Sequence, residues 1–415
     1  MKQSFALLDI GGTDIKSCIT NQDDTDLRVI YRSGTPGNLQ DGQNLYEISP
    51  NELLLEVENH LDSILAYKTK IDGLIISGQM GSWIISDSKN QPITNLISWQ
   101  DNRAAVNKGN FNETMIERLG TEWLEKTGNE VRSGLPLFGI ENMKSNLAHL
   151  KNLRIHTLIS WVSSQLSEDY LFQSHVTDFA STGMIDINSN TWSKAALNFI
   201  DFDLELPTLL TEMKTIGFSK ALSCPIYAPV GDQQASLYGA ELEKGKTVVN
   251  IGTGGQVAAV SSSYQKSALQ TRPYFNGLTI DTRTHLPAGR LISRCVKLLF
   301  PAEDTLNAFA KFLKQSEKFD TDAYLDVDSL GQGDFMSEFG DRDYAPSAIL
   351  NGIAVHYRRA ISEINLESCN NLIFAGGIGQ KFKKLQNTIS SGKTYEIAKS
   401  EETTLRGLML LSKTL

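Results

Sequence analysis

The chain has 415 residues, of which 40% are hydrophobic and 21% charged, and its formal net charge is -9 at pH 7. This length favours two domains of roughly 200 residues each, and the composition is that of a globular chain rather than a disordered one. The acidic balance argues against a nucleic-acid partner, because such a protein needs a basic stripe to neutralise phosphates.

Cysteine and histidine patterns exclude two further classes. The four cysteines have no CxxC spacing, and the six histidines form no HxxxH pair. We therefore expect neither a disulfide framework nor a zinc site. The first apolar segment, residues 5–10, ends at a glycine turn before it reaches the length of a signal peptide or membrane span. A cytoplasmic protein with no membrane partner is the simplest expectation.

The chain opens with two short apolar segments, residues 5–10 and 15–20, which predict a β-hairpin with a glycine-rich tip. Glycines let backbone N–H groups approach a polyphosphate closely, and the carboxylate of Asp9 at the strand end can hold Mg²⁺ through water. The alternative is a tight turn with a capping aspartate. The residues expected to contact phosphates here are Gly11, Gly12, Thr13 and Lys16.

Residues 51–68 have helical apolar spacing, and the strand at residues 74–76 and the segment at residues 97–103 each carry polar groups. Amide, indole, carboxylate and guanidinium groups suit a sugar, which has hydroxyls at its edges and C–H bonds on its faces. Asp101 and Arg103 could instead pair with each other and brace the loop. The candidate sugar contacts are Gln79, Met80, Trp99, Asp101 and Arg103.

Residues 224–230 predict a strand that opens the second half, so we expect domains at 1–228 and 229–415. Asp232 follows at a predicted junction between strand and helix. In phosphoryl transfer a carboxylate at such a place can accept the proton of the attacking hydroxyl. The alternative is that Asp232 is a helix N-cap.

Two later segments repeat the patterns of the first half in the same order, which predicts an internal duplication. Residues 248–255 repeat the strand and glycine tip of residues 7–13, and residues 372–379 repeat residues 74–81. Strands that alternate with helices, here at residues 301–314, 348–364 and 403–411, predict an α/β fold. The second tip adds Gly252, Thr253 and Gly254 as phosphate contacts, and Gly376 and Gly377 leave room for adenosine or form a simple strand-to-helix turn.

Together these segments resemble the FGGY family of carbohydrate kinases. The resemblance rests on the segments at residues 9–13, 76–80, 99–103, 177–193, 231–233, 252–254 and 376–377. Within the family the chain is most similar to sedoheptulokinases, on residues 231–236, 249–259 and 273–275, and xylulokinases come next. Gly81 stands where many xylulokinases have a histidine, which counts against xylulose, and residues 128–143 lack the usual family pattern.

The resemblance implies two duplicated actin/hexokinase-like (ribonuclease H-like) domains on either side of a nucleotide cleft, with ATP and Mg²⁺ as cofactors and a ketose as substrate. Asp232 would be the base, Asp9 would organise Mg²⁺ through water with Asp232 also close to the metal, and Gln233 would join the sugar contacts. The alternatives are a kinase for xylulose or another polyol, a catalytically silent sensor of nucleotide and sugar, and an actin-like assembly protein. A homodimer is left open.

Overall fold

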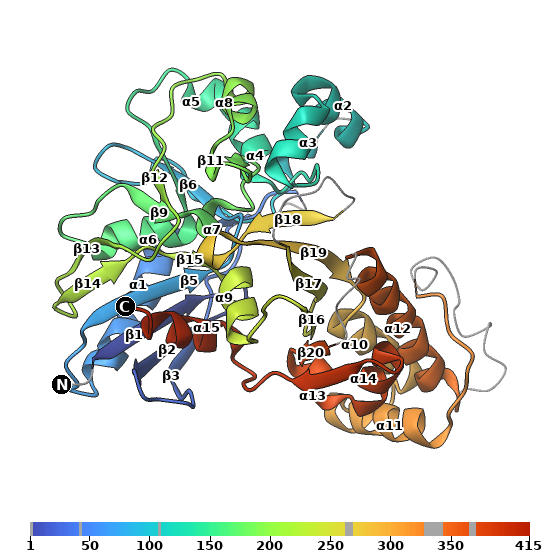
Figure 1. The fold of residues 1–415 in the computed structure, drawn as a ribbon. Coiled ribbons are helices and arrows are strands. Elements are labelled where there is room, and N and C mark those ends of the chain that lie inside the picture. Colours follow the sequence, from blue (N-terminus) through green and yellow to red (C-terminus); the bar gives the residue numbers. More distant parts are fainter. Residues whose placement is uncertain (1–2, 41–43, 107–108, 262–268, 328–342, 365–370) are drawn as a thin grey trace. The chain divides into compact units, whose positions relative to one another are not determined.

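The computed structural model describes residues 3–40, 44–106, 109–261, 269–327, 343–364 and 371–415, which form two compact units (Figure 1). The first unit comprises Met1–Gly239, Ser262–Ile280 and Glu402–Leu415, and the second comprises Ala240–Ser261 and Asp281–Glu401. The contacts thus place the first break after Gly239 and return two later segments to the first unit, whereas the sequence pattern suggested a single boundary after residue 228.

The first unit contains a main mixed sheet, a smaller antiparallel sheet, two strand pairs and the helices around them. Its main strands are β1 (Ser4–Ile10), β2 (Asp14–Asn21), β3 (Val29–Gly34), β5 (Gly73–Gly78), β13 (Thr215–Ser219), β14 (Cys224–Tyr227) and β15 (Val230–Gly231). Its other strands are β4 (Glu47–Ile48), β6 (Trp83–Ser86), β7 (Leu96–Ile97), β8 (Arg154–Thr157), β9 (Gln173–His175), β10 (Ile185–Asp186), β11 (Thr191–Trp192), β12 (Thr208–Leu210) and β18 (Gln270–Pro273). Its helices are α1 (Pro50–Leu65), α2 (Phe111–Leu119), α3 (Thr121–Thr127), α4 (Pro136–Asn142), α5 (Lys144–Leu147), α6 (Leu158–Leu166), α7 (Val176–Phe179), α8 (Lys194–Ile200), α9 (Asp232–Gly239) and α15 (Thr403–Ser412), with 3-10 turns at Arg103–Ala105 and Phe275–Gly277.

The main sheet of the first unit has the strand order β13-β14-β5-β1-β2-β3, and β15 also pairs with β5. Strands β1 and β2 form the predicted antiparallel hairpin, while β5 runs parallel to both β1 and β15. The central strands β1 and β5 are almost wholly buried and mostly apolar because both faces are covered. Leu8 and Ile76 share one core with Leu61 of α1 and Trp161 of α6. Strands β14 and β15, which the sequence pattern assigned to the opening of the second half, therefore belong to the sheet of the first unit.

Helix α15 lies against α9, although 163 or more residues separate them along the chain (Figure 1). Each helix has a glycine at the contact: a Cβ atom on Gly407 would lie 1.9 Å from the carbonyl oxygen of Ala235, and one on Gly239 would lie 1.9 Å from that of Thr403. The hydroxyl groups of Ser236 and Thr403 are 2.7 Å apart and hydrogen bond across the contact. Any side chain at either glycine would push the two helices apart.

The second unit repeats the strand arrangement of the first. Strands β16 and β17 are antiparallel like β1 and β2, and β16 runs parallel to β20 as β1 does to β5. Asn250 on β16 pairs with Ala375, in the way that Asp9 on β1 pairs with Ser77. The predicted duplication is therefore confirmed. The strands of this unit are β16 (Lys246–Ile251), β17 (Gly255–Ser261), β19 (Thr279–Leu286), β20 (Asn371–Ala375) and β21 (Thr394–Ile397), and its helices are α10 (Gly289–Leu299), α11 (Thr305–Lys318), α12 (Ala345–Glu363), α13 (Gly377–Lys381) and α14 (Lys383–Ser390).

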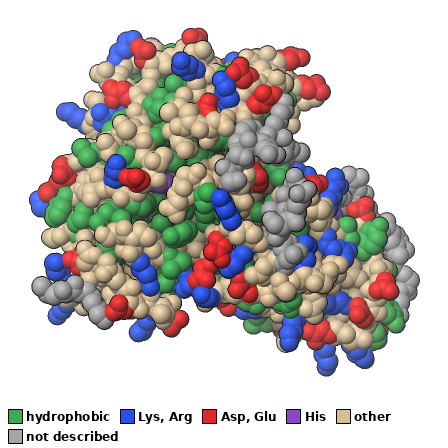
Figure 2. Space-filling model, in the orientation of Figure 1, with side chains coloured by type: hydrophobic (Ala, Val, Ile, Leu, Met, Phe, Trp, Pro, Cys, Tyr) green, Lys and Arg blue, Asp and Glu red, His purple; other side chains and the backbone are tan. Residues whose placement is uncertain are grey.

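Acidic and basic side chains are interspersed on the face of the molecule drawn in Figure 2. Among the described residues, no helix is both long enough and apolar enough to cross a membrane.

Candidate active site

Three parallel strands of the first unit end at one edge of its sheet, and each is followed by or ends in a polar residue. Strand β1 carries Asp9 next to its last residue, Gln79 comes directly after β5, and Asp232 comes directly after β15. The backbone N–H of Gln79 donates to the carbonyl of Ile10 over 2.9 Å, and this bond holds the ends of β1 and β5 together. The carboxyl ends of parallel strands are where α/β proteins place their ligands, and this edge brings both candidate carboxylates together.

Asp9 is a buried carboxylate that is only partly satisfied. Its side chain is 6% exposed, and its Oδ1 atom has no hydrogen-bond partner among the described residues. Burial, and after it the negative charge of Asp232, raises the pKa of Asp9 to about 8. A buried carboxylate oxygen without a donor is costly unless a cation or a proton compensates it.

Asp232 lies at the predicted junction between a strand and a helix, as the first residue of α9. Its Oδ1 accepts a hydrogen bond from the backbone N–H of Gln233 over 2.8 Å. Burial raises the pKa of Asp232 to about 6, although hydrogen bonds from the backbone N–H groups of Gln233 and Met80 stabilise the carboxylate and act to lower this pKa. The group is thus ionised at neutral pH and can accept a proton.

The two carboxylates form a donor set that fits Mg²⁺. Magnesium prefers oxygen ligands and keeps several waters, so that one or two carboxylates together with substrate phosphates commonly hold it. The described residues contain no group of three or more His, Cys, Asp or Glu side chains suited to a metal. The unsatisfied Oδ1 of Asp9 and the mutual repulsion of Asp9 and Asp232 both favour a cation at this edge.

The expected sugar contacts Gln79 and Trp99 lie together beside the first glycine tip. A Cβ atom on Gly12 would lie 3.6 Å from Oε1 of Gln79 and 3.9 Å from Nε1 of Trp99. Gln79 is buried, and its Nε2 group has no partner among the described residues. Met80 also belongs here, since a Cβ atom on Gly231 would lie 2.7 Å from its sulfur. The unpaired Nε2 group of Gln79 and the indole N–H of Trp99 are donors that suit the hydroxyl groups of a sugar.

Ser181 is a further polar residue at this place that the sequence did not single out. A Cβ atom on Gly81 would lie 3.4 Å from Oγ of Ser181 and 3.3 Å from Cβ of Trp99. The Ser181 hydroxyl is buried and has no hydrogen-bond partner among the described residues. Ser181 lies in the segment at residues 177–193 that contributes to the family resemblance, but only the fold shows that it lies beside Trp99.

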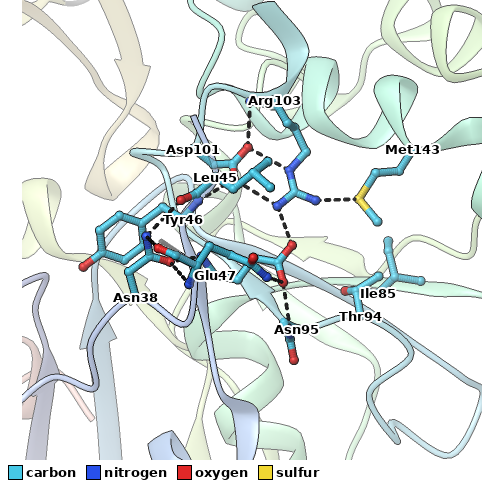
Figure 3. Close-up of polar contacts among 11 residues, drawn as sticks. Asn38, Leu45, Tyr46, Glu47, Ile85, Thr94, Asn95, Asp101, Arg103 and Met143 are labelled. Carbon is cyan, nitrogen blue, oxygen red and sulfur yellow. Dashed lines mark hydrogen bonds and ion pairs between the residues drawn. The ribbon is translucent and has the colours of Figure 1, made fainter. Parts of the chain in front are cut away.

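Asp101 and Arg103 form an ion pair with each other, which is one of the two alternatives that the sequence left open (Figure 3). Nε and Nη2 of Arg103 donate to the two oxygens of Asp101 over 2.7 and 2.9 Å, and Nη2 also donates to Glu47 over 2.7 Å. The backbone N–H of Tyr46 donates to Oδ2 of Asp101 over 2.7 Å. The charged groups of Asp101 and Arg103 thus bond to each other and to neighbouring segments of the unit at Tyr46, Glu47 and Met143, so this geometry favours a bracing role.

The first glycine tip, where phosphate contacts are predicted, has Gly12 and Thr13 exposed at its end. Gly11 is required for the turn, because a Cβ atom there would lie 2.9 Å from the carbonyl oxygen of Asp14. Lys16 is not free in this unit: its Nζ donates to Glu402 over 2.8 Å, and Glu402 also pairs with Arg32. A phosphate would have to compete with Glu402 for this lysine.

The second unit has a pocket of about 740 Å³ at its own glycine tip. It combines the predicted residues Gly252, Thr253 and Gly377 with three cations of α10, which the sequence pattern did not indicate. Gly376 has a φ of +77°, and a Cβ atom there would lie 2.5 Å from Oδ1 of Asn250, so glycine is required at this turn. The lining residues are Gly252, Thr253, Gly289, Arg290, Ser293, Arg294, Lys297, Gly377 and Ile378.

This pocket has the properties of a nucleotide site. The start of α10 borders the tip, since the N–H groups of Gly289 and Arg290 donate to the carbonyls of Gly252 and Thr253 over 3.0 and 3.2 Å. Basic side chains and a helix N-terminus attract phosphates. Gly254, also predicted, is exposed at the same tip.

In the first unit, the expected sugar contact Gln233 follows Asp232 in the first turn of α9, where it is half-buried.

The sequence of the first unit is similar to those of known carbohydrate kinases. Residues 5–239 match the profile of the N-terminal domain of the FGGY family of carbohydrate kinases. Apulose kinase from Pectobacterium atrosepticum is 27% identical over 214 residues, which are 46% of this chain and 41% of that protein, and xylulose kinase from Lactococcus lactis is 24% identical over 276 residues, 61% and 52% of the two chains. The matches thus span about half the length of these relatives.

Solved structures share the fold over nearly the whole chain. Gluconate kinase from Lactobacillus acidophilus superposes with a TM-score of 0.86 at 17% identity, covering 100% of this chain and 89% of that one. Glycerol kinase from Plasmodium falciparum, solved with ADP, superposes with a TM-score of 0.81 at 19% identity, covering 99% and 89%. The expected actin/hexokinase-like class of fold is therefore confirmed.

Proposed function

Because the chain belongs to the FGGY family of carbohydrate kinases, we propose that it transfers the γ-phosphate of ATP to a hydroxyl group of a sugar. The observation that carries this proposal is the edge of the first sheet, where Asp9, Asp232 and the unpaired amide of Gln79 come together. A metal-binding carboxylate, a base and sugar-binding donors are the parts that phosphoryl transfer to an alcohol needs.

Asp232 acts as the base. Its carboxylate is ionised above a pH of about 6 and is held in place by the N–H of Gln233, so it can accept the proton that the sugar hydroxyl loses as the new bond to phosphorus forms. Gln79, Met80, Trp99 and Gln233 orient the sugar. Bound Mg²⁺, held by Asp9 through water and lying close to Asp232, would neutralise charge on the phosphates.

ATP binds in the pocket of the second unit, with its phosphates at Gly252, Thr253 and Gly254 and its adenosine at Gly376 and Gly377. Arg290 and the other cations of α10 support the nucleotide there. In the first unit the phosphate contacts are Gly11, Gly12, Thr13 and Lys16.

The acceptor is a ketose, and the resemblance to sedoheptulokinases makes sedoheptulose the first sugar to test, with xylulose and other polyols next. Gly81 supports this order, because a histidine there would be strained: the φ of +78° is one that side-chain-bearing residues rarely adopt, and a Cβ atom would lie 3.3 Å from Cβ of Trp99.

The test is ADP release from MgATP over a panel of ketoses, with Asp232→Asn and the exposed control Asp203→Asn. We expect at least one sugar to stimulate ADP release, and Asp232→Asn to lower kcat by roughly 10²- to 10⁴-fold while nucleotide binding, measured by calorimetry, is kept. Loss of nucleotide binding in Asp232→Asn would assign this residue to folding or to the nucleotide, and stimulation by no sugar would refute the kinase proposal.

A further inference from the structure

Two arginines, Arg132 and Arg272, lie in one region of the first unit that the proposed reaction does not use: Arg272 hydrogen bonds to Asn129, which lies three residues before Arg132. Arg272 on β18 is 3% exposed, and it donates to Oδ1 of Asn129 over 2.6 Å and to Oε1 of Gln270 over 2.9 Å. Arg132 lies close enough for its charge to act on Arg272, and its own Nε group is buried without a hydrogen-bond partner among the described residues.

The positive charge of this pair is not balanced by the described residues around it. Both partners of Arg272 are neutral amide oxygens, and the carboxylate that faces the two arginines is Glu130, which accepts from Nε2 of Gln270 over 2.6 Å. Burial, and after it the charge of Arg132, lowers the pKa of Arg272 to about 9, and burial also lowers the pKa of Arg132. A buried guanidinium group on Arg272 and a half-buried one on Arg132 beside this carboxylate leave net positive charge, which an anion would compensate.

The pair adjoins the proposed sugar site through the loop that carries Arg132. At one end of this loop, Nδ2 of Asn129 donates over 3.4 Å to the carbonyl of Ala180, the residue before Ser181. At the other end, a Cβ atom on Gly134 would lie 2.2 Å from the carbonyl oxygen of Trp99. The loop therefore runs between the two segments that supply Ser181 and Trp99 to the sugar site.

We infer that Arg132 and Arg272 form an anion-binding subsite of the sugar site, and that the sugar carries a carboxylate or a phosphate group in addition to the hydroxyl that accepts the phosphoryl group. This inference rests on the proposed function and makes its substrate class more specific. Guanidinium groups bind both kinds of anion through paired, charge-assisted hydrogen bonds. A neutral sugar would leave the unpaired Nε of Arg132 and the charge of the pair uncompensated, so a neutral ketose is the weaker ligand.

The experiment measures binding by calorimetry, without nucleotide, for matched sugars that differ in one terminal group. Suitable pairs are sedoheptulose and sedoheptulose 7-phosphate, xylulose and xylulose 5-phosphate, and sorbitol and gluconate. We expect an anionic member to bind roughly 10- to 100-fold more tightly than its neutral partner, as charge-assisted hydrogen bonds predict. The phosphate and carboxylate arms show which anion the site takes.

The variant Arg132→Gln tests whether the pair is responsible. We expect it to remove the preference for the anion, while thermal unfolding stays at the same temperature or moves upward, because one of two like charges is gone. Arg272→Lys, which keeps the charge but not the paired geometry, should weaken anion binding to an intermediate degree. The exposed Arg359→Gln is the matched control and should change neither property.

The inference is overturned if no anionic member binds more tightly than its neutral partner, or if Arg132→Gln keeps the preference. It is also overturned if Arg132→Gln unfolds the protein, since the pair would then be structural. Failure of the kinase proposal gives a different result: no sugar, neutral or anionic, stimulates ADP release, whereas calorimetry still reports on the anion.

Discussion

Replacement of Asp9 by asparagine should make the ligand-free protein more stable, and increasingly so as the pH rises. The side chain is 6% exposed and its pKa rises from 3.8 to about 8, so the folded protein keeps a proton that the unfolded chain loses between these values. Because the folded state binds more protons in this window, stability falls as the pH rises through it. Asparagine has nearly the same shape and cannot ionise.

The expected size follows from the two pKa values of Asp9. At 1.36 kcal/mol for each pKa unit, the destabilisation by Asp9 is about 2 kcal/mol near pH 5.5 and about 5 kcal/mol near pH 8.5. Urea unfolding of wild type and Asp9→Asn at these two pH values measures the difference, with Asp203→Asn as an exposed control. We expect the variant to gain about 3 kcal/mol over wild type between the two pH values and to lose kinase activity.

An equal effect of Asp9→Asn at both pH values would refute the reasoning, because the carboxylate would then not be held protonated by its surroundings. Destabilisation of the variant at high pH would show that Asp9 makes a favourable charge interaction in the ligand-free protein. Either result would remove the main support for a cation at this edge of the sheet.

Three further predictions follow from the site and the fold. The kcat/KM for the sugar should rise as the pH rises through about 6, the pKa of Asp232, and a profile that is flat there would exclude this residue as the base. Asp101→Ala should cost about 1.5–3 kcal/mol in a urea titration, because it removes the charged hydrogen bonds between Asp101 and Arg103 and leaves Glu47 as the remaining carboxylate partner of Arg103. The KM for the sugar should change by less than about threefold, as for an ordinary surface variant. A large change in KM alone would instead make Asp101 a sugar ligand. Gly407→Ala should lower stability by about 1–3 kcal/mol because the added carbon collides with α9, and Gly37→Ala, whose Cβ position is open, should have little effect.

The sequence predicted those parts of the fold that local pattern determines. The hairpin tip after Asp9 and the helix expected at residues 51–68 depend on neighbouring residues, and the structure has both. Helix α1 begins at Pro50, and the side chain of its N-cap Ser49 accepts from the N–H of Glu52. The duplication was also predictable, because each unit repeats the same order of apolar strands and glycine turns.

Long-range contacts explain what the sequence could not show. Residues 224–230 look like an opening of the second half because Pro225 and Pro229 flank a short apolar run, yet the pairing of β14 and β15 with β5 places these strands in the first unit. The ion pair between Lys16 and Glu402 joins residues that are 386 positions apart. Ser181 and the cations of α10 have no motif of their own, and only packing brings them to Trp99 and to Thr253.

The return of α15 to the first unit bears on how this chain is made. A ribosome releases the segment before Gly239 long before it releases Gly407, so the helix that begins at Asp232 waits for its neighbour until nearly all of the protein has been synthesised. During that interval the surface of α9 that α15 will cover is bare and open to chaperones or to misassembly. Asp232, the proposed base at the start of α9, therefore reaches its final surroundings late in biosynthesis, and we expect activity only after both units have been produced.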